Sequence, residues 1–201
     1  SGLYFISTSN SLSFYDYVSG SFTTQVTTTQ VFRDPAAWYH IVVVYDTTNS
    51  TSANRVRMYV NGVQVTSFST STYPSQNYAS GFINASTYAT SIGREDGFGN
   101  YFDGYMTNIN FVDGQALSPY AFGNFNSYGV WAPVAYSGSY GTNGFYLPFN
   151  TNSSSYVGSF NGSSQYLQTT TATQVVPAGA FTVEALVYTT STSCLLYTSP
   201  S

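Results

Sequence analysis

Residues 38–66 read WYHIVVVYDTTNSTSANRVRMYVNGVQVT, and this stretch decides the fold class. It opens with a dense β-branched run at residues 41–44, which is typical of an interior strand because branched side chains pack well on a pleated surface. A polar loop at residues 47–54 closes this strand. The next segment returns toward it, so the stretch predicts neighbouring antiparallel strands.

That next segment alternates strictly. Val56, Met58 and Val60 point to one face, and the residues between them point to the other. Asn61-Gly62 then supplies the two positive-φ positions of a type I′ hairpin turn. The following valines predict the return strand.

The rest of the chain continues with strands and turns. A long loop is expected at residues 67–90, a strand from Phe102 through Phe111, and a turn at Asp113-Gly114. Helical periodicity is nearly absent, and strands recur every 8 to 12 residues. The predicted class is all-β, an antiparallel β-sandwich of the jelly-roll kind.

Composition narrows the function classes. Among 201 residues there are 4 Lys+Arg, 8 Asp+Glu, 20 Tyr, 15 Phe and 2 Trp. All four cations are Arg and they are scattered, so the basic stripe that nucleic acid requires is missing. The longest apolar run, residues 41–45, is far too short to span a membrane as a helix. A single cysteine, Cys194, excludes an intradomain disulfide framework.

Four segments together resemble the concanavalin A-like, laminin G-type jelly roll: residues 38–46, 57–62, 92–93 and 102–106. In that family the Trp-x-His strand packs beside the Tyr-Val-Asn-Gly hairpin, and the Asp-Gly strand closes the sheet. The resemblance implies structural roles for Trp38, His40, Asn61, Gly62, Asp103 and Gly104. Trp38 is expected in the core because it begins the β-branched strand.

Residues 111–119, 122–123 and 129–133, followed by residues 136–147, are similar to large structural proteins of tailed phages, notably marine ones. Trp131 lies between Pro-flanked segments here. We expect it to wedge this segment against the sandwich rather than bind a ligand.

The predicted domain organisation has four parts. Residues 1–126 form a jelly roll truncated at its start, and residues 127–155 form a linker or edge segment. Residues 156–193 resemble the opening strands of a second laminin G-type domain, although many relatives carry Trp where Leu186 stands. Residues 194–201 match a translated sequencing-library adapter end and are expected to be a scar.

Catalysis is not expected. The chain has two Glu and one His, and the adjacent Glu95 and Asp96 would point to opposite faces on a strand or be solvated in a turn. The Glu-x-Asp-x-x-Glu strand of the related glucanases is absent. His40, the only histidine, is expected to be hydrogen-bonded within the sandwich and has no second His for a metal pair.

Binding is the favoured activity. Laminin G-type domains often hold Ca²⁺ at the sandwich rim, and Asp46 and Asp96 are the conceivable ligands, with turn capping by Asp side chains as the alternative. Aromatic residues of the region 67–101 offer stacking platforms for sugars, or else cover sandwich edges or neighbouring subunits. These candidates are Tyr73, Tyr78, Tyr88, Phe98 and Tyr101.

The sequence therefore predicts a non-enzymatic, structural and adhesive module of a phage virion, tail-associated or fibre-like, that contacts host-surface glycans. Its expected location is the virion or the extracellular space, and its partners are other virion proteins and copies of itself in a homo-oligomer. Two alternatives stay open: a secreted bacterial adhesin or carbohydrate-binding module, and an accessory domain of a glycoside hydrolase.

Overall fold

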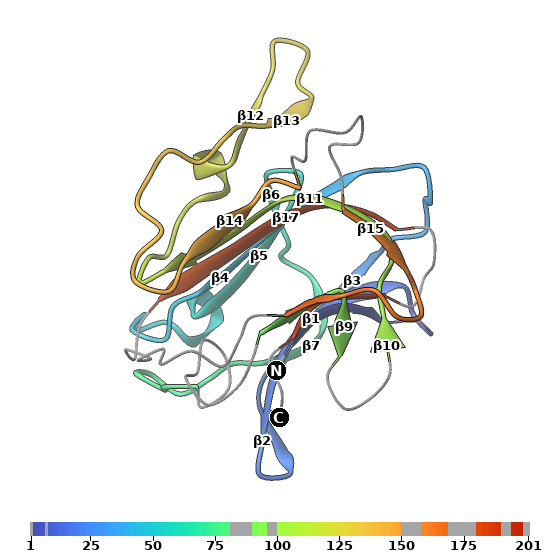
Figure 1. Ribbon diagram of the computed structural model, residues 1–201. Coiled ribbons are helices and arrows are strands. Elements are labelled where there is room, and N and C mark those ends of the chain that lie inside the picture. Colours follow the sequence, from blue (N-terminus) through green and yellow to red (C-terminus); the bar gives the residue numbers. More distant parts are fainter. Residues whose placement is uncertain are drawn as a thin grey trace.

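Two antiparallel sheets pack face to face in the computed structural model, which describes residues 2–6, 8–80, 90–95, 100–149, 158–168, 180–189 and 194–198 (Figure 1). The first sheet has the order β16-β8-β18-β1-β2-β3-β7. Its strands are β1 (Gly2–Ile6), β2 (Ser11–Val18), β3 (Ser21–Val31), β7 (Phe68–Thr72), β8 (Ser91–Ile92), β16 (Leu167–Gln168) and β18 (Cys194–Thr198).

The second sheet has the order β14-β11-β17-β4-β5-β6, with β15 also paired to β11. Its strands are β4 (Tyr39–Tyr45), β5 (Val56–Val60), β6 (Val63–Gln64), β11 (Asp103–Asp113), β14 (Phe145–Leu147), β15 (Gly158–Asn161) and β17 (Phe181–Thr189). The all-β antiparallel sandwich predicted from the sequence is confirmed.

Short elements complete the fold. Two ribbons, β9 (Arg94–Glu95) with β10 (Asn100–Tyr101) and β12 (Gly123–Phe125) with β13 (Trp131–Pro133), stand apart from the sheets. Two single 3₁₀ turns, η1 (Ser52–Asn54) and η2 (Pro119–Ala121), are the helical elements of the described residues. None of the described helices is long and apolar enough to cross a membrane.

The strand pair β4–β5 forms as its sequence predicts. β4 lies between β17 and β5, and the alternating residues of β5 are buried on one face only. The turn has φ of 49° at Asn61 and 78° at Gly62, both in the left-handed region that a type I′ turn requires. The Asn61 side chain also accepts a 2.8 Å hydrogen bond from the backbone N–H of His40, which ties the turn to β4.

Two local expectations are wrong. The predicted loop at residues 67–90 contains strand β7, because the alternating Ser and Thr residues there suit an edge strand beside β3. Trp38 is 38% exposed rather than in the core, and its ring packs at 5.4 Å on Tyr188. Trp38 lies just before β4, so the strand alternation that buries Ile41 does not bring the Trp38 ring into the core.

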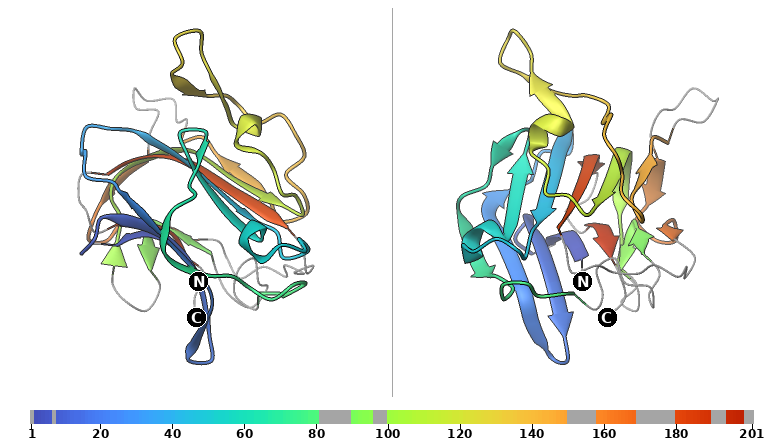
Figure 2. Two further views of the ribbon diagram at one scale, coloured as in Figure 1. Left: turned by 180° about the vertical axis from the view of Figure 1, so that it is seen from behind. Right: turned by 90° about the vertical axis from the view of Figure 1, so that its left-hand side faces the viewer.

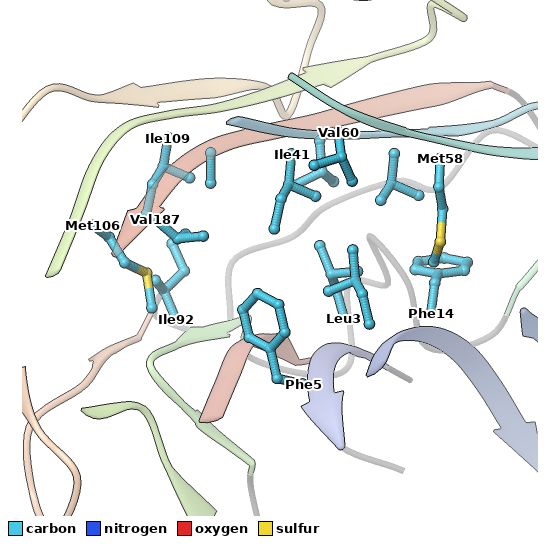
Figure 3. Close-up of a cluster of buried hydrophobic side chains, with 14 of the residues drawn as sticks. Leu3, Phe5, Phe14, Ile41, Met58, Val60, Ile92, Met106, Ile109 and Val187 are labelled. Atoms are coloured by element: carbon cyan, nitrogen blue, oxygen red, sulfur yellow. The ribbon is translucent and has the colours of Figure 1, made fainter. Parts of the chain in front are cut away.

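The main core fills the space between the sheets (Figure 3). Leu3, Phe5 and Phe14 face it from the first sheet, while Ile41 and Met58 face it from the second. Four aromatic rings form a stacked row across neighbouring strands of the second sheet: Tyr45, Phe181, Phe111 and Phe145, with centroids 5.0, 5.6 and 5.6 Å apart. Burying rings of this size stabilises the sandwich by about 1.5–3 kcal/mol each.

Strands from the last quarter of the chain belong to the same two sheets. β17 lies between β11 and β4, and β18 pairs with β1 and β8. A Cβ at Gly104 would lie 2.2 Å from the Tyr188 carbonyl oxygen, so this glycine permits β11 and β17 to approach closely. The proposed second unit at residues 156–193 and the adapter origin of residues 194–201 stay predictions; in this chain the described strands there complete one sandwich.

Candidate functional site

An aromatic and polar cluster lies on the β9–β10 ribbon, and we call Arg94, Glu95, Asn100, Tyr101 and Tyr166 the rim cluster. In the ribbon, Tyr101 pairs with Arg94 and Asn100 pairs with Glu95. Neighbouring residues of a strand point to opposite sides. One side therefore carries Arg94 and Tyr101, and the other carries Glu95 and Asn100.

The aromatic side of the rim cluster is built around Tyr166, which is 38% exposed. The Arg94 guanidinium carbon lies 3.5 Å from the centroid of the Tyr166 ring, a cation–π contact. The Tyr101 and Tyr166 rings lie 6.4 Å apart and are tilted by 48°. Two partly exposed phenol rings thus stand together at the surface.

The polar side is organised by Glu95. Its Oε1 accepts a 2.8 Å hydrogen bond from the Tyr15 hydroxyl, and its Oε2 accepts one of 2.8 Å from the Asn100 amide. Burial, together with the Glu95 carboxylate, raises the pKa of Tyr15, so this phenol remains a donor. The aromatic side offers apolar ring surface with the Arg94 guanidinium and the two phenol hydroxyls as polar groups beside it, the combination that sugar recognition uses.

Of the three predicted aromatic residues that the structure describes, Tyr73, Tyr78 and Tyr101, it brings Tyr101 into this cluster. Tyr73 packs against the main core. Tyr78 donates a 3.3 Å hydrogen bond to the carboxylate of Asp16, a residue with no exposed surface. Tyr88 and Phe98 lie outside the described residues.

Sequence reasoning missed Arg94 and Tyr166. Tyr166 is 65 positions from Tyr101, and the loop patterns that drew attention to residues 67–101 did not extend to it. Arg94 immediately precedes Glu95 in the Gly-Arg-Glu-Asp-Gly segment, so its position beside a turn was the available signal.

The two calcium candidates are not brought together by the described residues. Asp46 Oδ1 accepts hydrogen bonds from the backbone N–H and the hydroxyl of Thr48, at 3.2 and 2.6 Å, which is the turn capping expected of a loop Asp. Asp96 lies outside the described residues. Within the described part of the chain, no three His, Cys, Asp or Glu side chains gather where they could hold a metal ion. Calcium binding stays a prediction.

A buried polar network lies on the outer face of the second sheet, and we call it the His40 network. His40 Nε2 lies 2.7 Å from Glu184 Oε1, and both side chains are 1% exposed. Asn110 donates its side-chain N–H to Glu184 Oε2. The Tyr140 hydroxyl donates to Asn110 Oδ1 at 2.7 Å, and the Trp131 indole N–H donates to His40 Nδ1 at 3.0 Å.

The direction of these hydrogen bonds assigns the His40 tautomer. Indole N–H can only donate, so Nδ1 of His40 is the acceptor and the ring proton sits on Nε2, facing Glu184. Glu184 Oε2 accepts from Asn110 and Oε1 lies against His40 Nε2, so the contacts from both sides of the network end on this one carboxylate. Burial raises the pKa of Glu184, while the hydrogen bonds of His40 and Asn110 oppose that rise.

The network anchors residues 117–140, which we call the covering segment, on this face of the sheet. Val42, Val44, Val112 and Phe122 form a second apolar cluster on the same outer face, with Tyr136 and Tyr140 packed against it. Trp131 wedges between two glycines: a Cβ at Gly62 would lie 2.1 Å from its ring, and one at Gly123 would lie 2.4 Å from it. His40 and Trp131 are thus joined to each other and packed between the sheet and this segment.

Neither glutamate stands ready for glycosidic chemistry. Glu184 has 1% of its surface exposed, so a substrate cannot reach it. Glu95 already accepts hydrogen bonds on both oxygens from side chains of the protein. A hydrolytic pair needs a proton donor and a second carboxylate on either side of a bound sugar.

Comparison with known protein families supports the assignment of the chain to a lectin-type β-sandwich. The profile of the concanavalin A-like lectin/glucanases superfamily matches residues 2–121. The chain therefore belongs to this superfamily. Neither the curated proteins nor the solved structures searched contain a match to the chain.

Proposed function

We propose that this protein is a non-catalytic carbohydrate-binding and adhesive module, and that the rim cluster is its glycan site. The observation that carries the proposal is the pair of partly exposed rings, Tyr101 and Tyr166, beside Arg94 on a lectin-type sandwich. Pyranose rings pack on aromatic faces through C–H groups, and their hydroxyls bond to nearby polar side chains.

The charge at the rim indicates the kind of glycan. Arg94 is followed by the acidic Glu95 and Asp96, so the segment has no excess of positive charge. Arg94 also spreads its charge over the Tyr166 ring. A neutral oligosaccharide fits this balance better than a polyanionic one, which would need several cations.

The biological setting that we propose is a tail-associated or fibre-like protein of a phage virion, outside the cell, where the module would present its rim to host-surface glycans. The support is the similarity of residues 111–147 to structural proteins of tailed phages. A secreted bacterial adhesin, a carbohydrate-binding module of such a protein, or an accessory domain of a glycoside hydrolase would use the same rim. Genes flanking this one in its source DNA distinguish these settings.

The test of glycan binding is a screen of the 201-residue chain against neutral and acidic oligosaccharides, followed by titration of the best ligand. Tyr166→Ala should weaken binding at least 10-fold, because one stacking face is lost. Tyr105→Ala is the matched control, since Tyr105 is also 38% exposed and packs instead on Tyr188. Equal losses in both variants, or no bound glycan at all, would contradict the proposal.

The non-catalytic assignment has its own measurement. The chain is incubated with the ligand polysaccharide, and the release of reducing ends is followed. We expect none above the buffer blank. Release that persists in a Glu95→Gln, Glu184→Gln double variant would show contamination, whereas release that depends on either residue would contradict the assignment.

A further inference from the structure

The β12–β13 hairpin presents a preformed apolar tip to solvent. Tyr128 is 90% exposed and Val130 is 59% exposed. The tip is held by Asn126, whose side-chain oxygen accepts hydrogen bonds from the backbone N–H groups of Tyr128 (2.9 Å) and Val130 (3.0 Å). Two further backbone bonds of 2.9 Å, from Asn126 N to Val130 O and from Gly129 N to Asn126 O, close the turn.

The base of the hairpin is equally well held. Trp131 donates to His40 Nδ1 beneath it, and the rings of Tyr120 and Phe125 meet the indole edge-on at 5.5 and 5.0 Å. Because the hairpin is already held in place, binding of a partner orders few additional side-chain rotamers and little additional backbone in it. Such preorganisation raises affinity.

The hairpin projects away from both sheets (Figures 1 and 2). The side chains at its tip, Tyr128 and Val130, therefore stay exposed to solvent. Exposed apolar side chains gathered in this way at a protein surface mark a contact surface for another macromolecule.

Charge narrows the choice of partner. The chain has a net charge of −4, yet no charged residue occurs between Asp113 and Glu184, the interval that contains the whole hairpin. Two copies of the chain are both acidic overall, so they avoid like-charge repulsion where they meet through uncharged surfaces. An uncharged, apolar surface on a second copy therefore complements this hairpin.

The same chain carries such a surface. A recess of about 340 Å³ opens at the sandwich edge, where β8 and β16 of the first sheet approach β14 of the second. Ile92, Phe145, Leu147 and Leu167 line it, together with the uncharged Thr90 and Gln168. Its volume falls in the range of pockets that take small organic groups, about 300–1,000 Å³, so a phenol ring fits.

We propose that the hairpin tip of one copy inserts Tyr128 into the recess of a second copy. Because the tip and the recess are different surfaces, this contact is head-to-tail, and repeating it builds a chain or a ring of copies. The proposal concerns assembly and is independent of glycan binding at the rim.

Sedimentation velocity over a range of protein concentrations tests it. Wild-type protein should form dimers and larger species as the concentration rises. Tyr128→Ser, which removes the tip, and Leu167→Gln, which places an amide in the recess, should each weaken association at least 10-fold. Both side chains are substantially exposed (90% and 39%), so both variants keep the fold. Tyr105→Ser is the control and should associate as the wild type does.

Mixing the two variants gives the sharper readout. Tyr128→Ser keeps its recess and Leu167→Gln keeps its tip, so an equimolar mixture should form one-to-one heterodimers and nothing larger. A wild-type chain that stays monomeric up to about 1 mM, the weak limit of specific association, would overturn the proposal. Association that is unaffected by Leu167→Gln, as expected for contact between two tips, would also overturn the proposal. So would a mixture of the two variants that forms no heterodimers.

Discussion

Replacing His40 by Leu should strand two buried polar groups at once. Glu184 Oε1 loses the donor that lies 2.7 Å away, and the Trp131 N–H loses its acceptor at 3.0 Å. Leaving a buried donor or acceptor without its partner costs about 1–3 kcal/mol, and more for a charged group such as the Glu184 carboxylate. Leu fills a volume similar to His, so cavity formation adds little.

The loss should depend on pH. The pKa of Glu184 is raised in the folded state above its ordinary value of 4.5, so its contribution to stability is complete below that pH and is lost as the pH rises through the folded-state value. His40 opposes the rise, and His40→Leu therefore raises the pKa further. We expect the destabilisation by His40→Leu to be larger at pH 7 than at pH 4.5.

The assay is urea unfolding followed by far-UV circular dichroism at both pH values, with His40→Leu, Glu184→Leu and the double variant. The double variant removes the charge along with its partner and should be at least about 2 kcal/mol more stable than the sum of the single losses implies. A loss below about 1 kcal/mol for His40→Leu, the same at both pH values, would refute the view that Glu184 depends on His40.

Two further predictions concern the covering segment. Tyr140→Phe should lower the free energy of unfolding by about 1–2 kcal/mol, because it leaves the buried Asn110 oxygen without its 2.7 Å donor. Tyr146→Phe alters a residue that is 41% exposed and should change the free energy of unfolding by less than about 0.5 kcal/mol. Urea unfolding measures both variants, and equal losses would contradict the buried network. Gly123→Ala should cost about 1–3 kcal/mol, since its Cβ would lie 2.4 Å from the Trp131 ring, and Trp fluorescence should report a displaced indole; an unchanged spectrum and stability would show that the wedge is loose.

Local periodicity explains how much of the fold could be predicted. Strand β4, the alternation in β5 and the Asn61-Gly62 turn follow from the side-chain period and the φ preferences of neighbouring residues, and the long strand β11 begins within a residue of its predicted start. Trp38 shows the limit, because a residue just before a strand can belong to either face until the sheet forms.

The rim cluster could be predicted only in part. Tyr101 lies in the region whose aromatic residues suggested a sugar site. Its neighbour Tyr166 lies 65 positions further along the chain, outside that region. Tyr73 and Tyr78 satisfied the same compositional argument and are engaged with the core and with Asp16. Composition cannot separate a ring that faces solvent from one that closes an edge.

The sequence by itself determined the strand-and-turn character of this protein, its sandwich class and its superfamily, because these depend on patterns spanning a few residues. Tertiary structure alone decided the His40 network. Trp131 and His40 lie 91 positions apart, and Asn110 and Glu184 lie 74 apart. His40 was expected to be hydrogen-bonded within the sandwich, but only the antiparallel register of β4 and β17 places Glu184 diagonally across the same face from it.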